Sequence, residues 1–545
     1  MNGLDAVDLP AYDGPPVVVV GNGPVGQTVA LLLARWGVPT VVLDRRAERD
    51  VVGSKSICQQ RDVLDVWDAV GVGSAIADEG VTWVRARTFY RDRELFCIEF
   101  ADHGRSVFPP FVNISQSRTE QLLAAQVAHL PLVEERWGHT VTAVPPPDRH
   151  GEQVDLTVTG PAGEYVLHAP YVVLCAGSRC EDLRGQLGVS FEGRSFEDHF
   201  LICDIRAELP GWEQERRFYF DPEWNPGRQV LIHPCPDSTY RIDWQVPRTF
   251  DLAEEERSGA LDRRIRRIVG ESDYEIVWKS VYRFHSRRAN RMRAGRVLLA
   301  GDTAHVVAPF GARGLNSGVG DADNLAWKLA FVLRGWSDES LLDTYDQERR
   351  AAAQENLEVT TATMDFLVPQ TEEAWERRRT TLEQALWDPD ARARVDSGRL
   401  SEPFWYVDSP LTTPDPTRPP ATRPPRGHAP TPGVGVIVPD CPVRGDASRL
   451  RLLARHGLLL LVTDPEDVDA AVAATQHLTG PPVRVHAMAE LSPDGTLRDT
   501  LRARDNEVWV LRPDAYVAAV VPSSDRTRLR EAVSRCLAAA GPESL

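Results

Sequence analysis

The sequence is poor in lysine, has no excess of basic residues and contains no long apolar run. Lys55, Lys279 and Lys328 are its only lysines, and 79 acidic against 62 basic residues give a formal net charge of −17. That charge provides no basic field for a phosphate backbone, so nucleic acid is not an expected partner. No stretch approaches the roughly 18 apolar residues of a membrane helix, and no basic leader opens the sequence. We therefore expect a cytoplasmic protein without a membrane partner.

Cysteine is also sparse, which argues against two further classes. The eight cysteines are scattered singly, with neither CxxC pairs nor an HExxH motif. Because zinc sites need such spacings and small disulfide scaffolds need denser cysteines, we expect neither a metal site nor a disulfide framework. A content of 42% hydrophobic and 26% charged residues is instead typical of a globular chain, and its length suits about three domains.

A glycine turn between an apolar strand and a helical pattern is the first chemical signal. The β-branched run over 16–20 is followed by Gly21, Gly23 and Gly26 in a GxGxxG spacing, and a strand over 40–43 delivers Asp44, 23 positions after Gly21. In such a βαβ unit the glycines allow the turn, the approach of a pyrophosphate and close helix packing, while the acid binds a ribose. The unit predicts a dinucleotide site made by Gly21, Gly23, Pro24, Val25, Gly26, Asp44 and Arg45.

The rest of the chain divides into a sheet-rich middle and a separate C-terminal part. Residues 191–282 alternate polar and apolar residues, as half-buried antiparallel strands do. Nine prolines between Pro410 and Pro432 then predict a connector, because proline donates no backbone hydrogen bond and stiffens an extended chain. Further strands are expected at 171–174, 296–300, 457–462, 508–511 and 516–521, with helices at 321–333 and 527–540.

The segment over 295–329 identifies the family that the sequence resembles. It reads GRVLLAGDTAHVVAPFGARGLNSGVGDADNLAWKL, and it resembles the second FAD-binding motif of the single-component flavoprotein aromatic hydroxylases, which include phenol hydroxylase and 3-(3-hydroxyphenyl)propionate hydroxylase. Residues 116–120, QSRTE, are similar to the Gln-x-x-x-Glu helix start of that family, and residues 53–56, GSKS, to its segment beside the flavin. The resemblance spans nearly the whole chain.

The resemblance implies an α/β fold with three parts. These are a para-hydroxybenzoate-hydroxylase-like, Rossmann-type FAD-binding domain, a mainly antiparallel substrate sheet and a thioredoxin-like C-terminal domain. The implied boundaries are 1–185 and 286–405 for the FAD-binding domain, 186–285 with part of 80–112 for the substrate-binding domain, 406–432 for the Pro-rich linker and 433–545 for the C-terminal domain. Since the last has no CxxC, we expect it to be structural or oligomer-forming, within a homo-oligomer (dimer or higher).

The resemblance also assigns FAD-binding roles to particular residues. Asp302 would hydrogen-bond the ribityl chain, and the backbone amides of 311–316 would face the pyrimidine end of the flavin ring. A glycine-rich turn that opens a helix suits this position, because reduced flavin carries negative charge there. Pro309 would lie against the ring near its reacting edge. The residues implied in this way are Ser54, Lys55, Gln116, Asp302, Pro309, Gly314, Leu315 and Asn316.

The substrate side chains should come from the middle sheet. A phenol, with a pKa near ~10, reacts with an electrophilic flavin C4a-hydroperoxide far better as phenolate, so a base or cation beside its hydroxyl group helps. Strand alternation places His233 with Leu231 on one face and Arg241 with Asp243 on another, without deciding which face meets the flavin. The catalytic candidates are Pro309, Tyr219, His233, Arg241 and Tyr282.

One position departs from the family pattern. The family usually has an Asp-Gly pair after the strand that ends here at Leu174, in a region associated with nicotinamide docking, whereas this chain has Ala176 before Gly177. No second GxGxxG is present, so NADPH or NADH is expected to bind transiently and not in a domain of its own. Ala176 therefore puts the usual docking contact in doubt.

The function that these signals favour is that of an FAD-dependent, NAD(P)H-consuming monooxygenase. Its partners would be a small phenolic or related heteroaromatic substrate and O₂. A Baeyer–Villiger or epoxidising monooxygenase acting on a polyketide-like substrate is an open alternative. So are a flavin-binding protein without turnover, which Ala176 suggests, and an NAD-dependent dehydrogenase.

Overall fold

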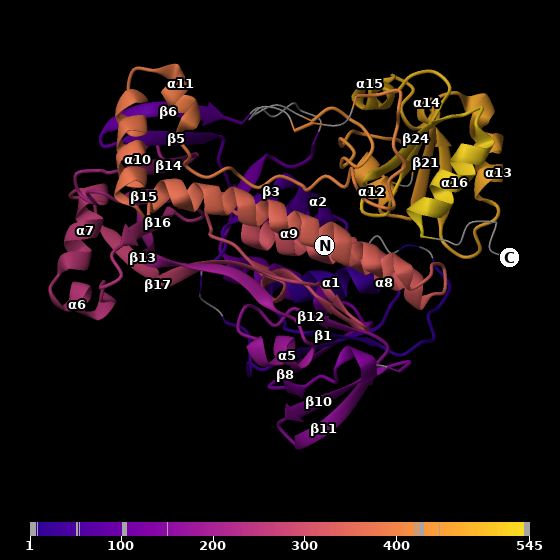
Figure 1. The fold of residues 1–545 in the computed structure, drawn as a ribbon, viewed down its shortest axis with the longest axis horizontal. Coiled ribbons are helices and arrows are strands. Elements are labelled where there is room, and N and C mark those ends of the chain that lie inside the picture. Colours follow the sequence, from indigo (N-terminus) through magenta and orange to yellow (C-terminus); the bar gives the residue numbers. More distant parts are fainter. Residues whose placement is uncertain are drawn as a thin grey trace.

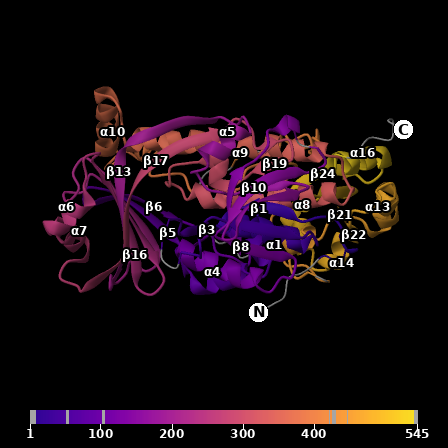
Figure 2. The ribbon, with the colours of Figure 1, turned by 90° about the horizontal axis from the view of Figure 1, so that it is seen from below.

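The structure, a computed structural model, describes residues 7, 9–50, 53, 55–100, 106–149, 151–419, 422–423, 430–445 and 447–538. A large, mainly antiparallel sheet lies at one end of its long axis, a mainly parallel sheet with its helices in the middle, and a smaller α/β domain at the other end (Figure 1). Figure 2 shows the same order from below. The mixed α/β architecture confirms the predicted fold class.

The central sheet is parallel except at one edge. Its strands follow the order β18 (Arg293–Ala294), β19 (Val297–Leu299), β12 (Val172–Leu174), β1 (Val17–Val20), β2 (Thr40–Asp44) and β8 (Val133–Trp137). The four inner strands β19, β12, β1 and β2 are short, mostly apolar and buried along their whole length, as expected for a parallel sheet covered on both faces. The carboxyl ends of β1, β2, β12 and β19 therefore meet at one edge.

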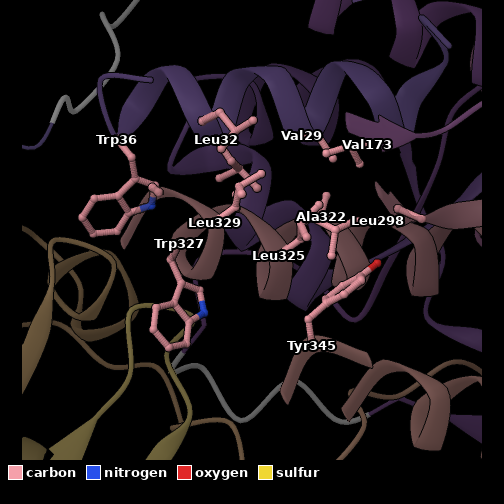
Figure 3. Close-up of a cluster of buried hydrophobic side chains, with 14 of the residues drawn as sticks. Val29, Leu32, Trp36, Val173, Leu298, Ala322, Leu325, Trp327, Leu329 and Tyr345 are labelled. Atoms are coloured by element: carbon pink, nitrogen blue, oxygen red, sulfur yellow. The ribbon is translucent and has the colours of Figure 1, made fainter. Parts of the chain in front are cut away.

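Two long helices cover this sheet. α1 (Pro24–Arg35) begins with proline, which suits the first helical position, and α8 (Arg313–Leu333) packs against it. Figure 3 shows Val29 and Leu32 of α1 facing Leu325 and Leu329 of α8. The sequence predicted α8 only from residue 321. Its first turns contain three glycines, which are poor helix formers, so here tertiary packing overrides propensity.

The large sheet supplies a second wall for the site. Its order is β20 (His305–Val306), β17 (Tyr274–Ala289), β13 (Phe191–Ala207), β16 (Thr239–Val246), β15 (Gln229–Cys235), β14 (Glu215–Phe220), β5 (Arg85–Tyr90) and β6 (Arg93–Glu99). Strands β5 and β6 come from the part of 80–112 that was expected to join it. Helix α7 (Ala260–Val269), preceded by α6 (Leu252–Arg257), buries Leu261 and Ile265 against one face. Part of the other face lines the site.

Smaller elements complete the FAD-binding half. Two three-stranded sheets are formed by β11 (Gly163–Ala169), β10 (Val154–Gly160) and β9 (Thr140–Ala143), and by β3 (Cys58–Gln60), β7 (Phe111–Asn113) and β4 (Val81–Thr82). The remaining helices here are α2 (Arg61–Asp68), α3 (Gly73–Glu79), α4 (Gln116–Val127), α5 (Glu181–Gln186) and α9 (Ser340–Leu367). Helices α10 (Glu372–Gln384) and α11 (Pro389–Arg394) lie beside β5 and β14 of the large sheet instead (Figure 1).

The C-terminal domain has a four-stranded sheet with its own core. The strand order is β22 (Val483–Ala487), β21 (Leu458–Val462), β23 (Glu507–Leu511) and β24 (Val517–Pro522). Its helices are α12 (Leu450–Ala454), α13 (Val468–Thr475), α14 (Met488–Leu491), α15 (Thr496–Leu501) and α16 (Arg526–Cys536). β21 and β22 are parallel, and β23 and β24 follow antiparallel. This mixed four-stranded sheet is compatible with a thioredoxin-like fold. The thioredoxin-like character of the domain stays a prediction.

Candidate functional site

One cavity of about 1160 Å³ lies between the carboxyl edge of the central sheet and the face of the large sheet opposite α7. A pocket for one small molecule commonly measures roughly 300–1,000 Å³, so this cavity has room for more than one ligand. Its walls bring together β1, β2 and the turns after β12 and β19 on one side and β13, β15, β16 and β17 on the other.

The glycine turn after β1 opens onto the cavity. Gly21, Gly23, Pro24 and Val25 all line it. A Cβ atom at Gly23 would meet no protein atom within 4 Å, so this backbone is open to a ligand. Gly26 does not line the cavity. A Cβ there would lie 1.9 Å from the Gly21 carbonyl oxygen, which is the close helix packing expected of the third glycine.

Asp44 ends β2 beside this turn and lines the cavity with Arg45. Its carboxylate accepts hydrogen bonds from the backbone N–H groups of Asn22 and Arg46, both at 2.8 Å, and from the Arg46 side chain. Although burial opposes ionisation, these bonds lower the pKa of Asp44 below its usual value. An ionised carboxylate has lone pairs left for ribose hydroxyl groups, so the residue fits its expected role.

Asp302 lies on a turn after β19 with its carboxyl group exposed to the cavity. Desolvation by the surrounding protein raises the pKa of Asp302, and the charges of His305 and Lys55 oppose that shift. Gly301 before it has a φ of +60°, which glycine adopts without strain. The Gly301 N–H group donates to the buried carboxylate of Asp321 at 2.9 Å, so the turn is held from behind.

The other residues assigned to FAD divide into three groups. The cavity is also lined by Lys55, Gln116, Pro309, Gly314 and Leu315. Asn316 is absent from its wall: the Asn316 side chain is buried and bonds the Cys58 and Ala312 carbonyl oxygens and the Gln60 N–H group, so it holds β3 against α8. Ser54 lies outside the described residues.

The opposite wall is one face of the large sheet. Leu231 pairs with Asp243 and His233 pairs with Arg241 in the antiparallel ladder of β15 and β16. Directly paired residues project to the same side of a sheet, and all four line the cavity. Alternation within each strand did not show which residues face the cavity. The pairing shows that both sets lie on one largely polar surface, next to Phe200 and Ile202 of β13.

This surface carries the ion pair of Arg241 and Asp243 beside the neutral imidazole of His233. Arg241 donates from Nε to Asp243 Oδ1 at 2.9 Å and from Nη1 to the Lys55 carbonyl oxygen at 3.2 Å. Burial and the cationic Arg216 and Arg241 hold the pKa of His233 well below its usual range, so the imidazole is neutral. Its Nδ1 atom has no hydrogen-bond partner among the described residues.

The two tyrosine candidates lie on different faces. Tyr282 of β17 lines the cavity. Tyr219 does not, and its ring stacks on Phe89 at 4.6 Å and lies near Trp224. The reason is register: Tyr219 pairs with Val230, which faces the α7 side of the sheet, whereas its neighbour Phe218 pairs with Leu231 on the cavity side. Tyr219 therefore does not line the substrate side of the cavity.

The sequence reasoning missed some residues that line the cavity. Arg216 of β14 and Phe310, after Pro309, are the main ones. The alternation of Arg216, Phe218 and Phe220 places these three side chains on one face of β14. The sequence alone does not show that this face meets the cavity. Ala176 and Gly177 line the cavity as well, with Arg179 and Asp182 nearby on the wall.

Comparison with protein families agrees with this geometry. The FAD binding domain family matches residues 15–360, which is more than half of the chain. The family described as aromatic-ring hydroxylase, C-terminal, matches residues 431–540. Together with the open glycine turn and the acids at two strand ends, these matches define a flavoprotein whose cofactor is FAD.

Similar individual proteins indicate which class of flavoprotein this is. A 3-(3-hydroxy-phenyl)propionate/3-hydroxycinnamic acid hydroxylase of Mycolicibacterium smegmatis is 31% identical over 66% of this chain and 61% of that protein. An anhydrotetracycline monooxygenase of Streptomyces rimosus is 30% identical over 92% of this chain and 94% of that protein. The crystal structure of the flavin-dependent monooxygenase PieE, in complex with FAD and substrate, has a TM-score of 0.82 at 23% identity, over 97% of this chain and 100% of that chain. This chain belongs to the FAD-dependent aromatic-ring monooxygenases.

The described ranges contain neither a candidate membrane-spanning helix nor a candidate metal site. No helix there combines the length and the hydropathy needed to cross a bilayer. No group of three or more His, Cys, Asp and Glu side chains there is arranged to hold a metal ion.

Proposed function

We propose that the protein inserts one oxygen atom of O₂ into the ring of a phenol or related heteroaromatic compound, with NADPH or NADH as electron donor. The products would be the hydroxylated ring, oxidised nicotinamide and one water molecule. The observation that carries the proposal is the shared cavity, in which the FAD-binding turns face the polar surface of His233 and Arg241. Bound FAD supplies the redox chemistry and the activation of O₂.

The cofactor would be held by backbone turns. Gly21, Gly23 and the N-terminus of α1 suit the pyrophosphate, Asp44 the ribose, and Asp302 the ribityl chain. Lys55, Gln116 and the turn from Pro309 to Leu315 would surround the flavin ring. We assign Pro309 to the ring face near the substrate, since it lines the cavity and carries no N–H group.

The substrate would be activated by charge on the large sheet. Arg216 and Arg241 would stabilise the phenolate form of the ring, which is the more reactive form. His233 lines the cavity in its neutral form and its Nδ1 atom is buried, so the two guanidinium groups would be the groups that lower the free energy of the phenolate.

The apolar part of the wall would hold the ring. Phe200, Ile202, Leu231 and Phe310 line the cavity beside the charged surface, and Tyr282 closes it from β17. A flat aromatic compound with one polar edge matches such a wall. The named relatives suggest both a monocyclic hydroxyphenyl acid and a polycyclic phenol as trial substrates.

Isotope incorporation tests the proposal. The holoenzyme is incubated under ¹⁸O₂ with NADPH or NADH and a panel of monocyclic and polycyclic phenols, and products are analysed by mass spectrometry. We expect one ¹⁸O atom in a new hydroxyl group and one nicotinamide oxidised per product. Insertion next to a carbonyl carbon would favour the Baeyer–Villiger alternative. Hydrogen peroxide as the only product from every aromatic compound would contradict the proposal.

The setting of the enzyme is part of the same proposal. We assign it to the cytoplasm and to a homo-oligomer, in which the C-terminal domain contributes to assembly. Light scattering on the purified protein tests the second assignment against the 60.6 kDa mass of one chain.

A further inference from the structure

The C-terminal domain lies beyond α8 and α9, away from the large sheet (Figure 1). It meets these helices through buried charges. Arg512 donates to Glu348 of α9 at 2.5 and 2.9 Å, and Lys328 of α8 donates to the same carboxylate at 2.6 Å. All three side chains are at most 1% exposed. Because an unpaired buried charge is costly, these helices depend on the C-terminal domain being docked.

A continuous series of contacts leads from this domain toward the FAD-binding half. Tyr406 packs in the C-terminal core, with its ring 4.4 Å from that of Tyr516. The Tyr406 hydroxyl group accepts a hydrogen bond from Arg349 Nη1 at 2.8 Å. Arg349 Nε in turn donates to Asp321 Oδ1 at 2.7 Å. Tyr406, although placed in the linker by the sequence, therefore connects the C-terminal core to α9 and α8.

The same carboxylate reaches the turn that carries Asp302. Asp321 Oδ2 accepts from the Gly301 N–H group at 2.9 Å and lies 2.7 Å from Nε2 of His305. Asp321, Arg349, Tyr406 and His305 are 0–4% exposed, so water does not compete for these bonds. The position of the Gly301 turn is thereby linked to the position of Tyr406.

The segment just before Tyr406 supports the second FAD-facing turn. Ser401 donates its backbone N–H to the Gly311 carbonyl oxygen at 2.7 Å, and Arg313 Nε donates to the Arg399 carbonyl oxygen at 3.1 Å. A Cβ atom at Gly311 would lie 2.1 Å from that Arg399 oxygen, so the two backbones are in direct contact. The second FAD-facing turn is therefore held by the segment that leads directly into Tyr406 and the C-terminal core.

We propose that the C-terminal domain holds the two FAD-binding turns in their binding geometry, with Tyr406 and Arg349 as positioning residues. Neither residue lines the cavity, so each would act through Asp321 and not by touching the cofactor. The proposal rests on FAD binding alone and is independent of the hydroxylation reaction and its substrate.

The test compares two tyrosine variants of the full chain. Tyr406→Phe removes the hydroxyl group that Arg349 contacts. Tyr516→Phe, the matched control, removes a hydroxyl group that donates to the Phe404 carbonyl oxygen at 2.9 Å in the same interface. FAD is titrated into each apoprotein by flavin fluorescence. We expect roughly tenfold weaker FAD binding for Tyr406→Phe, as for one lost bond to a charged group, and a change within about twofold for Tyr516→Phe.

Amide hydrogen exchange of the same apoproteins provides a second readout. The Gly301 amide should exchange faster in Tyr406→Phe than in the parent and in Tyr516→Phe, while the β21 and β23 amides stay equally protected in all three. This comparison separates positioning from a general loss of stability. Equal FAD affinity in all three proteins, or equal losses of affinity and protection in both variants, would overturn the proposal.

Discussion

The two walls of the cavity are built in different ways. The FAD-binding wall includes open main chain at Gly23, after β1, and at Gly314, in the first turn of α8, where an added Cβ atom would meet no protein atom within 4 Å. The opposite wall consists of side chains on one face of a sheet, among them His233, Arg241 and Phe200. A backbone wall accepts little variation, because any side chain there fills the space of the cofactor. A side-chain wall can be changed residue by residue while the sheet stays intact.

This difference explains how one fold serves relatives with different named substrates. The cofactor wall depends on strand order and glycine positions, which the fold determines. The substrate wall depends on which side chains occupy alternate positions of β13, β15, β16 and β17. Changes on the first wall should therefore abolish FAD binding, whereas changes on the second should spare FAD and alter turnover.

The largest effect is expected on the FAD-binding wall. Gly23→Val places a side chain where no protein atom lies within 4 Å, so the chain should fold while the pyrophosphate position is blocked. We expect FAD affinity to fall by roughly 100-fold or more, about 2.7 kcal/mol. Gly185→Val is the control, because that glycine of α5 is exposed and has equal space around it. Normal FAD binding by Gly23→Val, measured by titrating the apoprotein, would remove the glycine turn from the site.

The next largest effect is expected on the substrate wall. Arg241→Met removes a buried cation and its bonds to Asp243 and to the Lys55 carbonyl oxygen. We expect kcat/KM to drop about 100-fold, as for loss of a buried charge pair, with FAD affinity changed by less than about twofold. Arg206→Met, on the exposed end of β13, is the matched control and should keep full turnover. If Arg241→Met lost FAD instead, the two walls would not be separable.

A smaller effect concerns pH. The folded-state pKa of His233 lies well below the value of 6.5 that it has when unfolded, so the unfolded chain binds one proton more below that pH. Stability from this group is complete above pH 6.5 and is lost as the pH falls, by up to about 1.4 kcal/mol per pH unit. Denaturant unfolding between pH 7 and 5 should therefore show a shallower loss for His233→Gln. Identical slopes in the parent and in His233→Gln would show that His233 is not held neutral.

The smallest effect separates the two faces of the large sheet. Tyr219→Phe changes a hydroxyl group on the face away from the cavity, so turnover should stay within about twofold of the parent. Tyr282→Phe changes a residue that lines the cavity and should alter KM for the aromatic substrate more than Tyr219→Phe does. Steady-state kinetics on both variants decide this. A larger effect from Tyr219→Phe would mean that the wrong face of the sheet has been assigned.

The sequence predicted the FAD-binding wall much better than the substrate wall. Glycine spacing, Asp44 and the segment around Asp302 report local backbone geometry, which a short stretch of sequence can specify. The side chains of the large sheet depend on register between distant strands. The pairing of Leu231 with Asp243 decides the face, and alternation within one strand does not contain it. Tyr219 was assigned wrongly for that reason.

The contacts with the C-terminal domain could not be predicted from the sequence, because they also join residues that are distant along the chain. Arg349 and Tyr406 are 57 positions apart, and their bond exists only because α9 and the segment after α11 pack together. The nine prolines between Pro410 and Pro432 predict a connector. They carry no information about which residues before them join the C-terminal core.

Anaerobic mixing of the holoenzyme with NADPH or NADH tests the central claim most directly, with and without a phenol, while the visible flavin bands are recorded. The claim is that one cavity places an aromatic ring beside FAD. It predicts bleaching that is slow with the nicotinamide alone and faster when a phenol that fits the sheet wall is added. Flavin bands that no combination of nicotinamide and phenol bleaches would contradict the account.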